Sequence, residues 1–368
     1  MKFGFTTGSA ATAATKAALM YLITLEKKNI SIVTPSGENY IPEVFGYECS
    51  RQSCNSLKAG DSASCYVIKE SGDDPDITAG MEIYATVTLT ECRDVFITGG
   101  EGIGVVTRTG LDQKVGEYAI NSTPRKTITE EVNNLIDEYD IEYGVTVKIA
   151  APRGVEISKK TFNPHMGIEG GISIIGTSGI VKPMSTEALL DTIKLDINMQ
   201  YSEGKTRCVI VPGNYGVTFL ENNYAMNEKD IVLCSNFVGD SMRFAVDIGF
   251  KHILFCSHIG KMIKVSGGVM NTHSMYGDRR MELMLEAFLE ANNKDMESED
   301  VKAISERILN CVSTTAALNI LEEFNVVKKV SEVIVEKTKK ELEKVCSGKA
   351  IVDVILYENS YGELARSF

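Results

Sequence analysis

Short apolar runs separated by polar turns fill the second half of the chain. Residues 208–211, 231–234 and 253–256 each predict a buried strand, and an amphipathic stretch at 241–248, followed by Gly249, predicts a helix between the last two. Strand, helix and strand at this spacing predict a βαβ unit with parallel strands. Open parallel sheets bind ligands beyond the carboxyl ends of their strands. The pattern therefore predicts a small-molecule site at that edge.

The rest of the second half continues this alternation. Helices are predicted at 280–291, 301–311, 314–324 and 328–345, and a last strand at 350–356 precedes a short polar tail. Together these elements predict an α/β domain with a small parallel sheet of about four strands.

The first half combines an apolar helix with strands. The alanine-rich run 10–25, after the N-cap candidates Thr6 and Thr7, predicts a helix rather than a signal sequence, because Lys16 interrupts it and no cleavage site follows. A second, amphipathic helix is predicted at 129–138. Strands are predicted at 30–33, 64–69, 83–89, 95–98 and 145–150. Several strands follow one another without helices between them, so this half is predicted to be α+β.

Size and composition agree with two globular domains. The 368 residues exceed one ordinary core, and a helix at 186–201 lies near the predicted boundary, which gives an α+β domain at 1–190 and an α/β domain at 191–368. A net charge of −12 disfavours nucleic acid and anionic membranes as partners. Nine cysteines without a C-x-x-C pair fit neither a zinc site nor a complete set of disulfides, so we expect reduced thiols and a cytoplasmic location.

Glycines and short polar residues follow each of the three apolar runs. Such polar side chains suit the ribose, adenine or amino-acid parts of a cofactor, and the glycines allow its close approach to the backbone. Asn and Gly also simply turn a chain after a strand, so this alternative stays open. The candidate cofactor-binding residues are Gly213, Asn214, Gly216, Asn236, Gly239 and Asp240.

A glycine-rich turn at 99–104 offers a rival cofactor site. It follows the predicted strand 95–98 and resembles a dinucleotide fingerprint, which requires a helix directly after it. Gly110, Gly116 and Pro124 leave no room for a long helix, and no acidic ribose-binding residue follows at the expected distance. We expect a flexible loop near the substrate instead, and a nicotinamide-dependent oxidoreductase is the chief alternative function.

Several further segments occur in a fixed order over nearly the whole chain. They are TTGSA at 6–10, GDDPDIT at 72–78, NP at 163–164, GGISIIGTSG at 170–179, SHIGK at 257–261 and GGVMNTHS at 267–274. Together they resemble the CbiD family, the cobalt-precorrin-5B C(1)-methyltransferases of anaerobic cobalamin (vitamin B12) biosynthesis. One departure is Ala10, where relatives often carry Cys, so a thiol at this position has no role here.

The resemblance implies a fold, a cosubstrate and a reaction. It implies an α+β domain followed by a parallel-sheet α/β domain, and methyl transfer from S-adenosyl-L-methionine to ring carbon C1 of a cobalt-containing tetrapyrrole, giving cobalt-precorrin-6A. Cobalt then belongs to the substrate, and no metal site of the protein is expected. A non-catalytic corrinoid-binding protein is another alternative. Homo-oligomerisation and transient contact with neighbouring pathway enzymes stay open.

Two histidines and a carboxylate are the candidate catalytic residues. His258 or His273 could accept a proton or orient the macrocycle, because imidazole titrates near neutral pH. Asp74 lies with Asp73 and Asp76 in a polar loop and could act as a base. A hydrogen-bonded structural histidine and an ordinary solvated turn are the alternatives.

A tetrapyrrole with many carboxylates requires cations in its site. Two groups of Lys and Arg residues flank the family motifs and could bind these carboxylates. Each of these residues could instead be an ordinary solvated surface charge. The groups are Arg153, Lys159 and Lys160, and Lys261, Lys264, Arg279 and Arg280.

Overall fold

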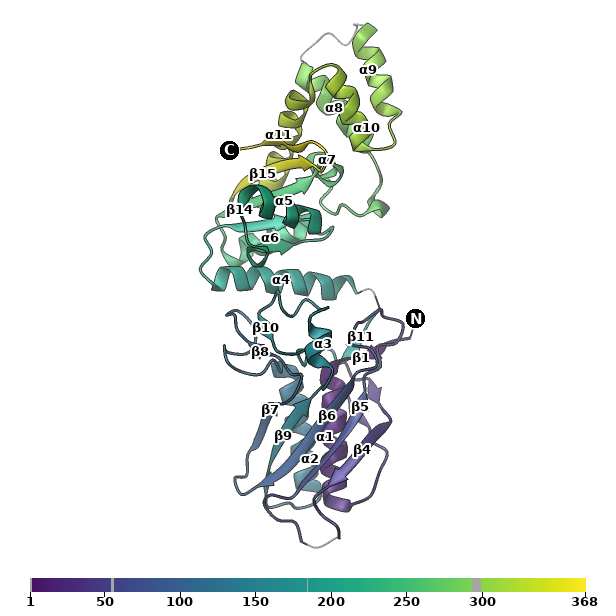
Figure 1. Cartoon of the computed structure of the whole chain (residues 1–368), viewed down its shortest axis with the longest axis vertical. Helices are drawn as coiled ribbons and strands as arrows, with labels where there is room; N and C mark the ends of the chain where they lie inside the picture. Colours follow the sequence, from purple (N-terminus) through teal and green to yellow (C-terminus); the bar gives the residue numbers. More distant parts are fainter. Residues whose placement is uncertain (1, 54–55, 184, 293–298) are drawn as a thin grey trace. The chain divides into compact units, whose positions relative to one another are not determined.

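The chain divides into two compact units, Met1–Ser185 and Thr186–Phe368, each of which mixes helices and strands (Figure 1). The computed structural model describes residues 2–53, 56–183, 185–292 and 299–368. Each unit contains one five-stranded sheet. The predicted division at 190/191 lies inside the helix α4 (Thr186–Ser202), with which the second unit begins.

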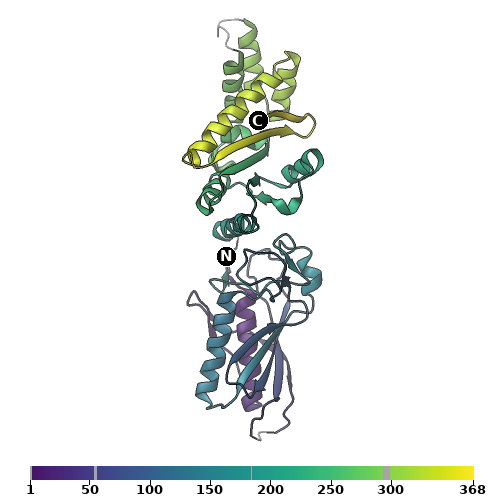
Figure 2. The ribbon, with the colours of Figure 1, turned by 90° about the vertical axis from the view of Figure 1, so that its left-hand side faces the viewer.

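In the first unit, two helices cover one face of the five-stranded sheet (Figure 2). The strand order is β4-β5-β6-β9-β7, and all pairs are antiparallel except β7 with β9. The strands are β4 (Val44–Cys49), β5 (Ser62–Ile68), β6 (Glu82–Thr90), β7 (Val95–Gly99) and β9 (Gly144–Ala150), and the helices are α1 (Thr7–Thr24) and α2 (Ser122–Glu138). This arrangement confirms an α+β first half.

The helix α1 begins at Thr7 because Thr6 caps it. The Thr6 backbone is extended, and its Oγ1 accepts a hydrogen bond from the Ser9 N–H at 3.2 Å. Alanines allow close packing, and Ala10 is fully buried. The helix α2 begins at Ser122, several residues before the predicted start at 129. The prediction missed the first turn because it is polar apart from Pro124, although proline is favoured at the start of a helix.

Short strand pairs that the sequence pattern did not predict hold the loops of this unit. The pairs are β1 (Gly4–Phe5) with β11 (Ile180–Val181), β2 (Ile32–Val33) with β3 (Asn39–Tyr40), and β8 (Val105–Val106) with β10 (Ile168–Glu169). The strand predicted at 30–33 is therefore only two residues long. A short helix, α3 (Gly154–Ser158), follows β9.

The sheet of the second unit has the order β13-β12-β14-β15-β16. Its first four strands are parallel, as predicted. The expectation of a polar tail was wrong, because residues 362–366 form a fifth strand, which pairs antiparallel with β15. Leu364 and Ala365 of this fifth strand pack on the core. The strands are β12 (Cys208–Val211), β13 (Ile231–Leu233), β14 (His252–His258), β15 (Ile351–Glu358) and β16 (Gly362–Arg366).

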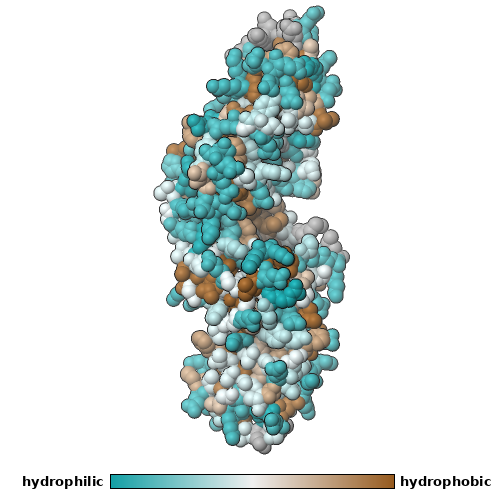
Figure 3. Space-filling model, in the orientation of Figure 1, coloured by the Kyte–Doolittle hydropathy of each residue, from teal (hydrophilic) through white to brown (hydrophobic). Residues whose placement is uncertain are grey.

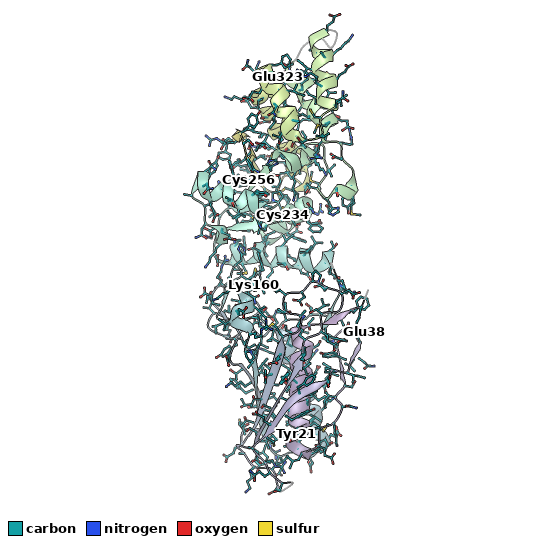
Figure 4. The ribbon with its side chains drawn as sticks, turned by 45° about the vertical axis from the view of Figure 1, so that its right-hand side comes forward. Tyr21, Glu38, Lys160, Cys234, Cys256 and Glu323 are labelled. Carbon is teal, nitrogen blue, oxygen red and sulfur yellow. The ribbon has the colours of Figure 1, made fainter. Side chains whose placement is uncertain are left out.

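Helices cover both faces of this sheet. Val209 and Val211 point toward α5, whereas Cys208 and Ile210 join the larger core on the opposite face. Cys234 and Cys256, labelled in Figure 4, are fully buried within the unit. The helices are α5 (Asn214–Tyr224), α6 (Val238–Ile248), α7 (Ile259–Ser266), α8 (Arg280–Asn292), α9 (Glu299–Leu309), α10 (Thr314–Glu323) and α11 (Val327–Val345).

The chain reverses its direction across the sheet at β12. It passes from β12 to β13 through α5, and then crosses back through α6 to β14 on the other side of β12. Because α5 and α6 contribute to opposite faces, the carboxyl ends of β12 and β14 form a topological switch point. The predicted ligand edge of the sheet is therefore present.

On the face that Figure 3 shows, the helices of the second unit carry mostly hydrophilic residues. No helix within the described ranges is long and apolar enough to cross a membrane.

Candidate functional site

The three predicted turns meet at Lys261. Its Nζ donates a hydrogen bond to Pro212 O at 2.8 Å and is 3.3 Å from Ser235 O, so the ends of β12, β13 and β14 are joined. Burial lowers the pKa of Lys261, as does the neighbouring Lys264. This ammonium therefore holds the edge of the sheet together, whereas the sequence predicted it as a cation for the substrate.

The turn after β12 is open to a ligand. Gly213 ends the turn, and a Cβ added to it would meet no atom within 4 Å. Asn214 is exposed and begins α5, so it lies in the first helical turn, where the Gly216 N–H already donates to Gly213 O at 2.9 Å. Gly216 has a structural role, since its Cβ would lie 2.9 Å from Val211 Cβ. The predicted loop 212–216 is thus the start of a helix.

The turn after β13 holds a distant segment of chain. Asn236 Oδ1 accepts a hydrogen bond from Thr272 Oγ1 at 3.1 Å, and its backbone O accepts the Thr272 N–H at 3.0 Å. The Gly239 N–H donates to Met270 O at 3.0 Å, and a Cβ at Gly239 would lie 2.7 Å from Met270 Cβ. Two of the cofactor candidates therefore position residues 270–272, and no hydrogen bond of the Asn236 side-chain amide nitrogen occurs among the described residues.

Protein groups face both ring nitrogens of His258. Its Nδ1 accepts the Gly260 N–H at 3.1 Å and caps α7, and its Nε2 lies 3.7 Å from Glu358 Oε1. The Tyr357 ring packs edge-on, with 5.6 Å between centroids. Burial lowers the pKa of His258, although Glu358 opposes this shift. The predicted catalytic imidazole is therefore engaged in structure.

Glu358 is a residue of this site that the sequence analysis missed. Only 4% of its surface is exposed, and its carboxylate accepts hydrogen bonds from Ser360 N at 2.6 Å, Tyr361 N at 3.2 Å and Thr315 Oγ1 at 3.1 Å. Burial raises the pKa of Glu358, but these hydrogen bonds and His258 outweigh burial and lower it overall. The sequence could have indicated Glu358 as a site residue, because it closely follows the last predicted parallel strand and therefore lies at the same sheet edge as His258.

The second predicted histidine is exposed. His273 caps a short 3₁₀ turn, η2 (Ser274–Tyr276), because its Nδ1 accepts the Met275 N–H at 3.2 Å. Met275 and Tyr276 are 75% and 58% exposed. This segment directly follows Thr272 and therefore begins at the edge of the sheet.

The remaining charged candidates of this unit differ in their surroundings. Lys264 is buried, and its Nζ donates to Thr272 O at 3.3 Å. Asp240 forms an ion pair with Arg243 at 2.7 Å. Arg279 is exposed and lies 3.4 Å from a carboxylate oxygen of Glu286, and Arg280 hydrogen-bonds Asp278 and lowers the pKa of that carboxyl to about 2. Of these residues, Arg279 best fits the prediction of an accessible cation.

The first unit carries Asp74, Arg153 and Lys159. Asp74 is half-buried in its polar loop, in which Asp76 bonds the buried Lys69 and Asp73 accepts the Lys2 N–H at 2.6 Å. Arg153 and Lys159 are exposed at the two ends of α3. Lys160, labelled in Figure 4, is also exposed and lies 4.0 Å from Glu156. Asp74 therefore belongs to a different unit from both candidate histidines.

The glycine turn at 99–104 is closed by packing. A Cβ at Gly102 would lie 1.8 Å from Ala151 O, and Cβ atoms at Gly154 and Gly171 would lie 2.0 and 2.2 Å from Gly102 O. The short strand β8, not a helix, follows the turn. The dinucleotide alternative was therefore wrong, because the glycines let three backbone segments pack together and no helix follows the turn. Whether this loop lies near the substrate stays a prediction.

Comparison with known proteins identifies the family. Residues 1–183 match the family model CbiD, and residues 271–368 match the model of the CbiD C-terminal domain. A cobalt-precorrin-5B C(1)-methyltransferase from Thermoanaerobacter sp. is 37% identical over 370 residues, covering 100% of this chain and 95% of that protein. The chain belongs to the CbiD family. The Methanocaldococcus jannaschii protein of the same name is also 37% identical, covering 100% of this chain and 96% of that protein.

A solved crystal structure is also similar to this chain. It is the cobalamin biosynthesis protein CbiD from Archaeoglobus fulgidus, which is 24% identical and covers 76% of this chain and 84% of that one, with a TM-score of 0.38. The assignment to the CbiD family rests on the full-length relatives.

The CbiD motifs of the first unit meet at the start of α1. Thr7 Oγ1 accepts the Ile175 N–H at 2.9 Å, the Gly8 N–H donates to Ile175 O at 2.9 Å, and Ser9 Oγ donates to Gly179 O at 2.7 Å. The TTGSA and GGISIIGTSG segments therefore lie side by side despite their separation in sequence. Ala10 is fully buried in the core of the first unit.

Proposed function

We propose that this chain transfers a methyl group from S-adenosyl-L-methionine to ring carbon C1 of cobalt-precorrin-5B, giving cobalt-precorrin-6A in anaerobic cobalamin biosynthesis. The observation that carries the proposal is the group of full-length relatives named for this reaction. The similarity to these relatives covers both units of the chain. Every cysteine in the described ranges is free, which fits the cytoplasmic location we propose.

The switch point of the second unit suits the cosubstrate. Gly213 leaves open space beyond β12, and the exposed Asn214 offers an amide for hydrogen bonds. The first turn of α5 presents backbone N–H groups, which favour a carboxylate such as that of the methionine portion. The side-chain amide nitrogen of Asn236 can supply one more donor at the same edge. We therefore propose that Asn214, with the turn around it, makes the main contacts.

The reaction needs orientation more than chemical groups from the protein. S-adenosyl-L-methionine supplies a methyl group on a sulfonium, and in-line displacement requires the attacking carbon about 3–3.5 Å from that methyl. The protein therefore has to position two ligands and exclude competing water. The hydrogen bonds from Lys261 to Pro212 O and Ser235 O support this role, because they fix the turns that would hold the cosubstrate.

Exposed residues near the edge suit the tetrapyrrole. Tyr215, Met275 and Tyr276 are large and exposed, and such side chains can pack against the flat apolar faces of a macrocycle. Arg279 can bind peripheral carboxylates in a bidentate manner. His273 is the accessible imidazole of this set. The other predicted contacts, Asp74, Arg153 and Lys159, stay predictions.

Anaerobic turnover tests the proposal directly. Purified protein is mixed with enzymatically generated cobalt-precorrin-5B and methyl-labelled S-adenosyl-L-methionine, and the products are analysed by mass spectrometry and NMR. A tetrapyrrole heavier by one labelled methyl group at C1 is the expected result. Bound but unchanged tetrapyrrole, with active upstream enzymes, would instead favour a corrinoid-binding protein.

A further inference from the structure

The bond between His258 and Gly260 fixes the position of a proton. Nδ1 of His258 accepts the Gly260 N–H at 3.1 Å, so this nitrogen carries no proton while the bond exists. A neutral imidazole has one proton, which must then lie on Nε2. The cap of α7 thus requires the Nε2–H tautomer.

The Glu358 carboxylate lies close to that nitrogen. Its Oε1 is 3.7 Å from Nε2, and its carboxylate is buried and held by Ser360 N, Tyr361 N and Thr315 Oγ1. Three donors fix the carboxylate and keep it ionised, and a fixed negative charge favours the N–H over the lone pair of the imidazole on this side. The carboxylate therefore selects the tautomer that the cap requires.

The same contacts orient the start of α7. His258 ends β14, Glu358 ends the adjacent β15, and Gly260 lies in the first turn of the helix. Lys261 follows in that turn and binds the carbonyl oxygens after β12 and β13. The direction of the Lys261 side chain thus depends on the cap that His258 provides.

We infer that Glu358 is a positioning residue of the switch-point site, which holds His258 as the Nε2–H tautomer and thereby orients α7 and Lys261 toward the three strand-end turns. The tautomer follows from the contacts alone, whereas its effect on cosubstrate binding rests on the proposed function. His258 then acts as part of the frame of the site, and it is not the base that removes a proton from the substrate.

Nitrogen NMR tests the tautomer. The chain has only four histidines, so long-range ¹H–¹⁵N correlations can be assigned with single His→Asn variants. His273 is an internal control, because its Nδ1 also accepts an N–H two residues ahead, at 3.2 Å, but no carboxylate faces its Nε2 among the described residues. We expect His258 to be the Nε2–H tautomer. A mixed or Nδ1–H tautomer at His258 would overturn the inference.

Substitutions at the carboxylate extend the test. Glu358→Gln should give a mixture of the two His258 tautomers, and Thr315→Val should have a smaller effect in the same direction. Glu358→Asp keeps the carboxylate and should retain more of the Nε2–H tautomer than Glu358→Gln. Glu363→Gln, on the neighbouring β16, is the matched control and should leave the His258 signals unchanged. Thr315→Val keeps the inference testable if Glu358→Gln unfolds. Unchanged His258 signals in folded Glu358→Gln would contradict the assignment.

Calorimetry with S-adenosylhomocysteine then measures the effect on the site. We expect Glu358→Gln to weaken binding about tenfold, which corresponds to about 1.4 kcal/mol, with a smaller loss for Thr315→Val. Normal binding by a folded Glu358→Gln whose tautomer has changed would overturn the positioning role. If the wild-type chain fails to bind the probe while its tautomer is as expected, the proposed cosubstrate site fails, and with it the effect on binding, but the tautomer assignment stands.

Discussion

The glycine turn at 99–104 and the turn that ends at Gly213 both follow strands, yet their surroundings are opposite. A Cβ added to Gly102 would meet Ala151 O at 1.8 Å, whereas one added to Gly213 would meet no atom within 4 Å. Other backbone segments close the first turn, and the second opens beyond the end of a parallel sheet and leads into a helix. Glycine after a strand therefore marks a ligand site only when the strand pairing and the following helix leave space for one.

The largest effect should come from Gly102→Ala. Its Cβ would overlap Ala151 O, and the backbone has a φ of +74°. We expect the free energy of unfolding of the first unit to fall by about 3 kcal/mol, as measured by urea denaturation. Gly80→Ala is the matched control, because Gly80 has the same φ of +74° but no atom within 4 Å. The control should cost about 1 kcal/mol, and equal losses would show that packing does not distinguish the turns.

The two asparagines of the second unit should respond differently to alanine. Asn214→Ala should weaken S-adenosyl-L-methionine binding about tenfold and leave the unfolding free energy unchanged, because the side chain is exposed. Asn236→Ala should also lose about 1 kcal/mol of stability, since its Oδ1 binds Thr272. Calorimetry and urea denaturation of both variants separate the two effects. Unchanged affinity in a folded Asn214→Ala variant would place the cosubstrate elsewhere.

The stability of the second unit should depend on pH through His258. Burial lowers the pKa of this residue in the folded chain, although Glu358 opposes the shift. Between that lowered pKa and about 6.5, the unfolded chain binds more protons, so stability rises with pH in this window. His258→Asn retains an acceptor for the Gly260 N–H and should reduce the slope by up to about 1.4 kcal/mol per pH unit. Urea midpoints at several pH values measure the slope, and an unchanged slope would contradict the role of His258.

Gly213→Ala should change stability far less than Gly102→Ala. The φ of Gly213 is 169°, which is extended backbone that alanine also adopts, and no atom lies within 4 Å of the new Cβ. We expect the unfolding free energy to stay within about 0.5 kcal/mol of wild type, while cosubstrate binding weakens because the methyl group enters the open space. A large loss of stability would show that this turn is as closely packed as the turn at 99–104.

The buried strands could be predicted because their apolar runs have a clear period. Residues 208–211 are continuously apolar, as in a strand buried on both faces. Residues 83–89 alternate, as in a strand buried on one face. The helices α5 and α7 were missed, since each begins among glycine and polar residues directly after a strand. Short strand pairs such as β1 with β11 depend on contacts between distant segments, which no local pattern contains.

The edge of the sheet could be predicted, but the partners of its side chains could not. Lys264 was predicted to bind the substrate, yet it is buried on Thr272 O. Glu358 was not considered, because its burial depends on Thr315 and His258, which are distant in sequence. Hydrogen bonds of this kind arise only once the fold brings the segments together.

The two outer strands of the second sheet also bear on self-association. A free edge exposes unpaired backbone groups that can accept a strand from another molecule, and proteins prevent this with short or charged edge strands. The outer strand β13 has only three residues, and the opposite edge, β16, carries Glu363 and Arg366. Both ends of the sheet thus discourage intermolecular β-pairing. Self-association of the second unit should therefore use helical or loop surfaces, and this folded unit should resist aggregation by strand addition.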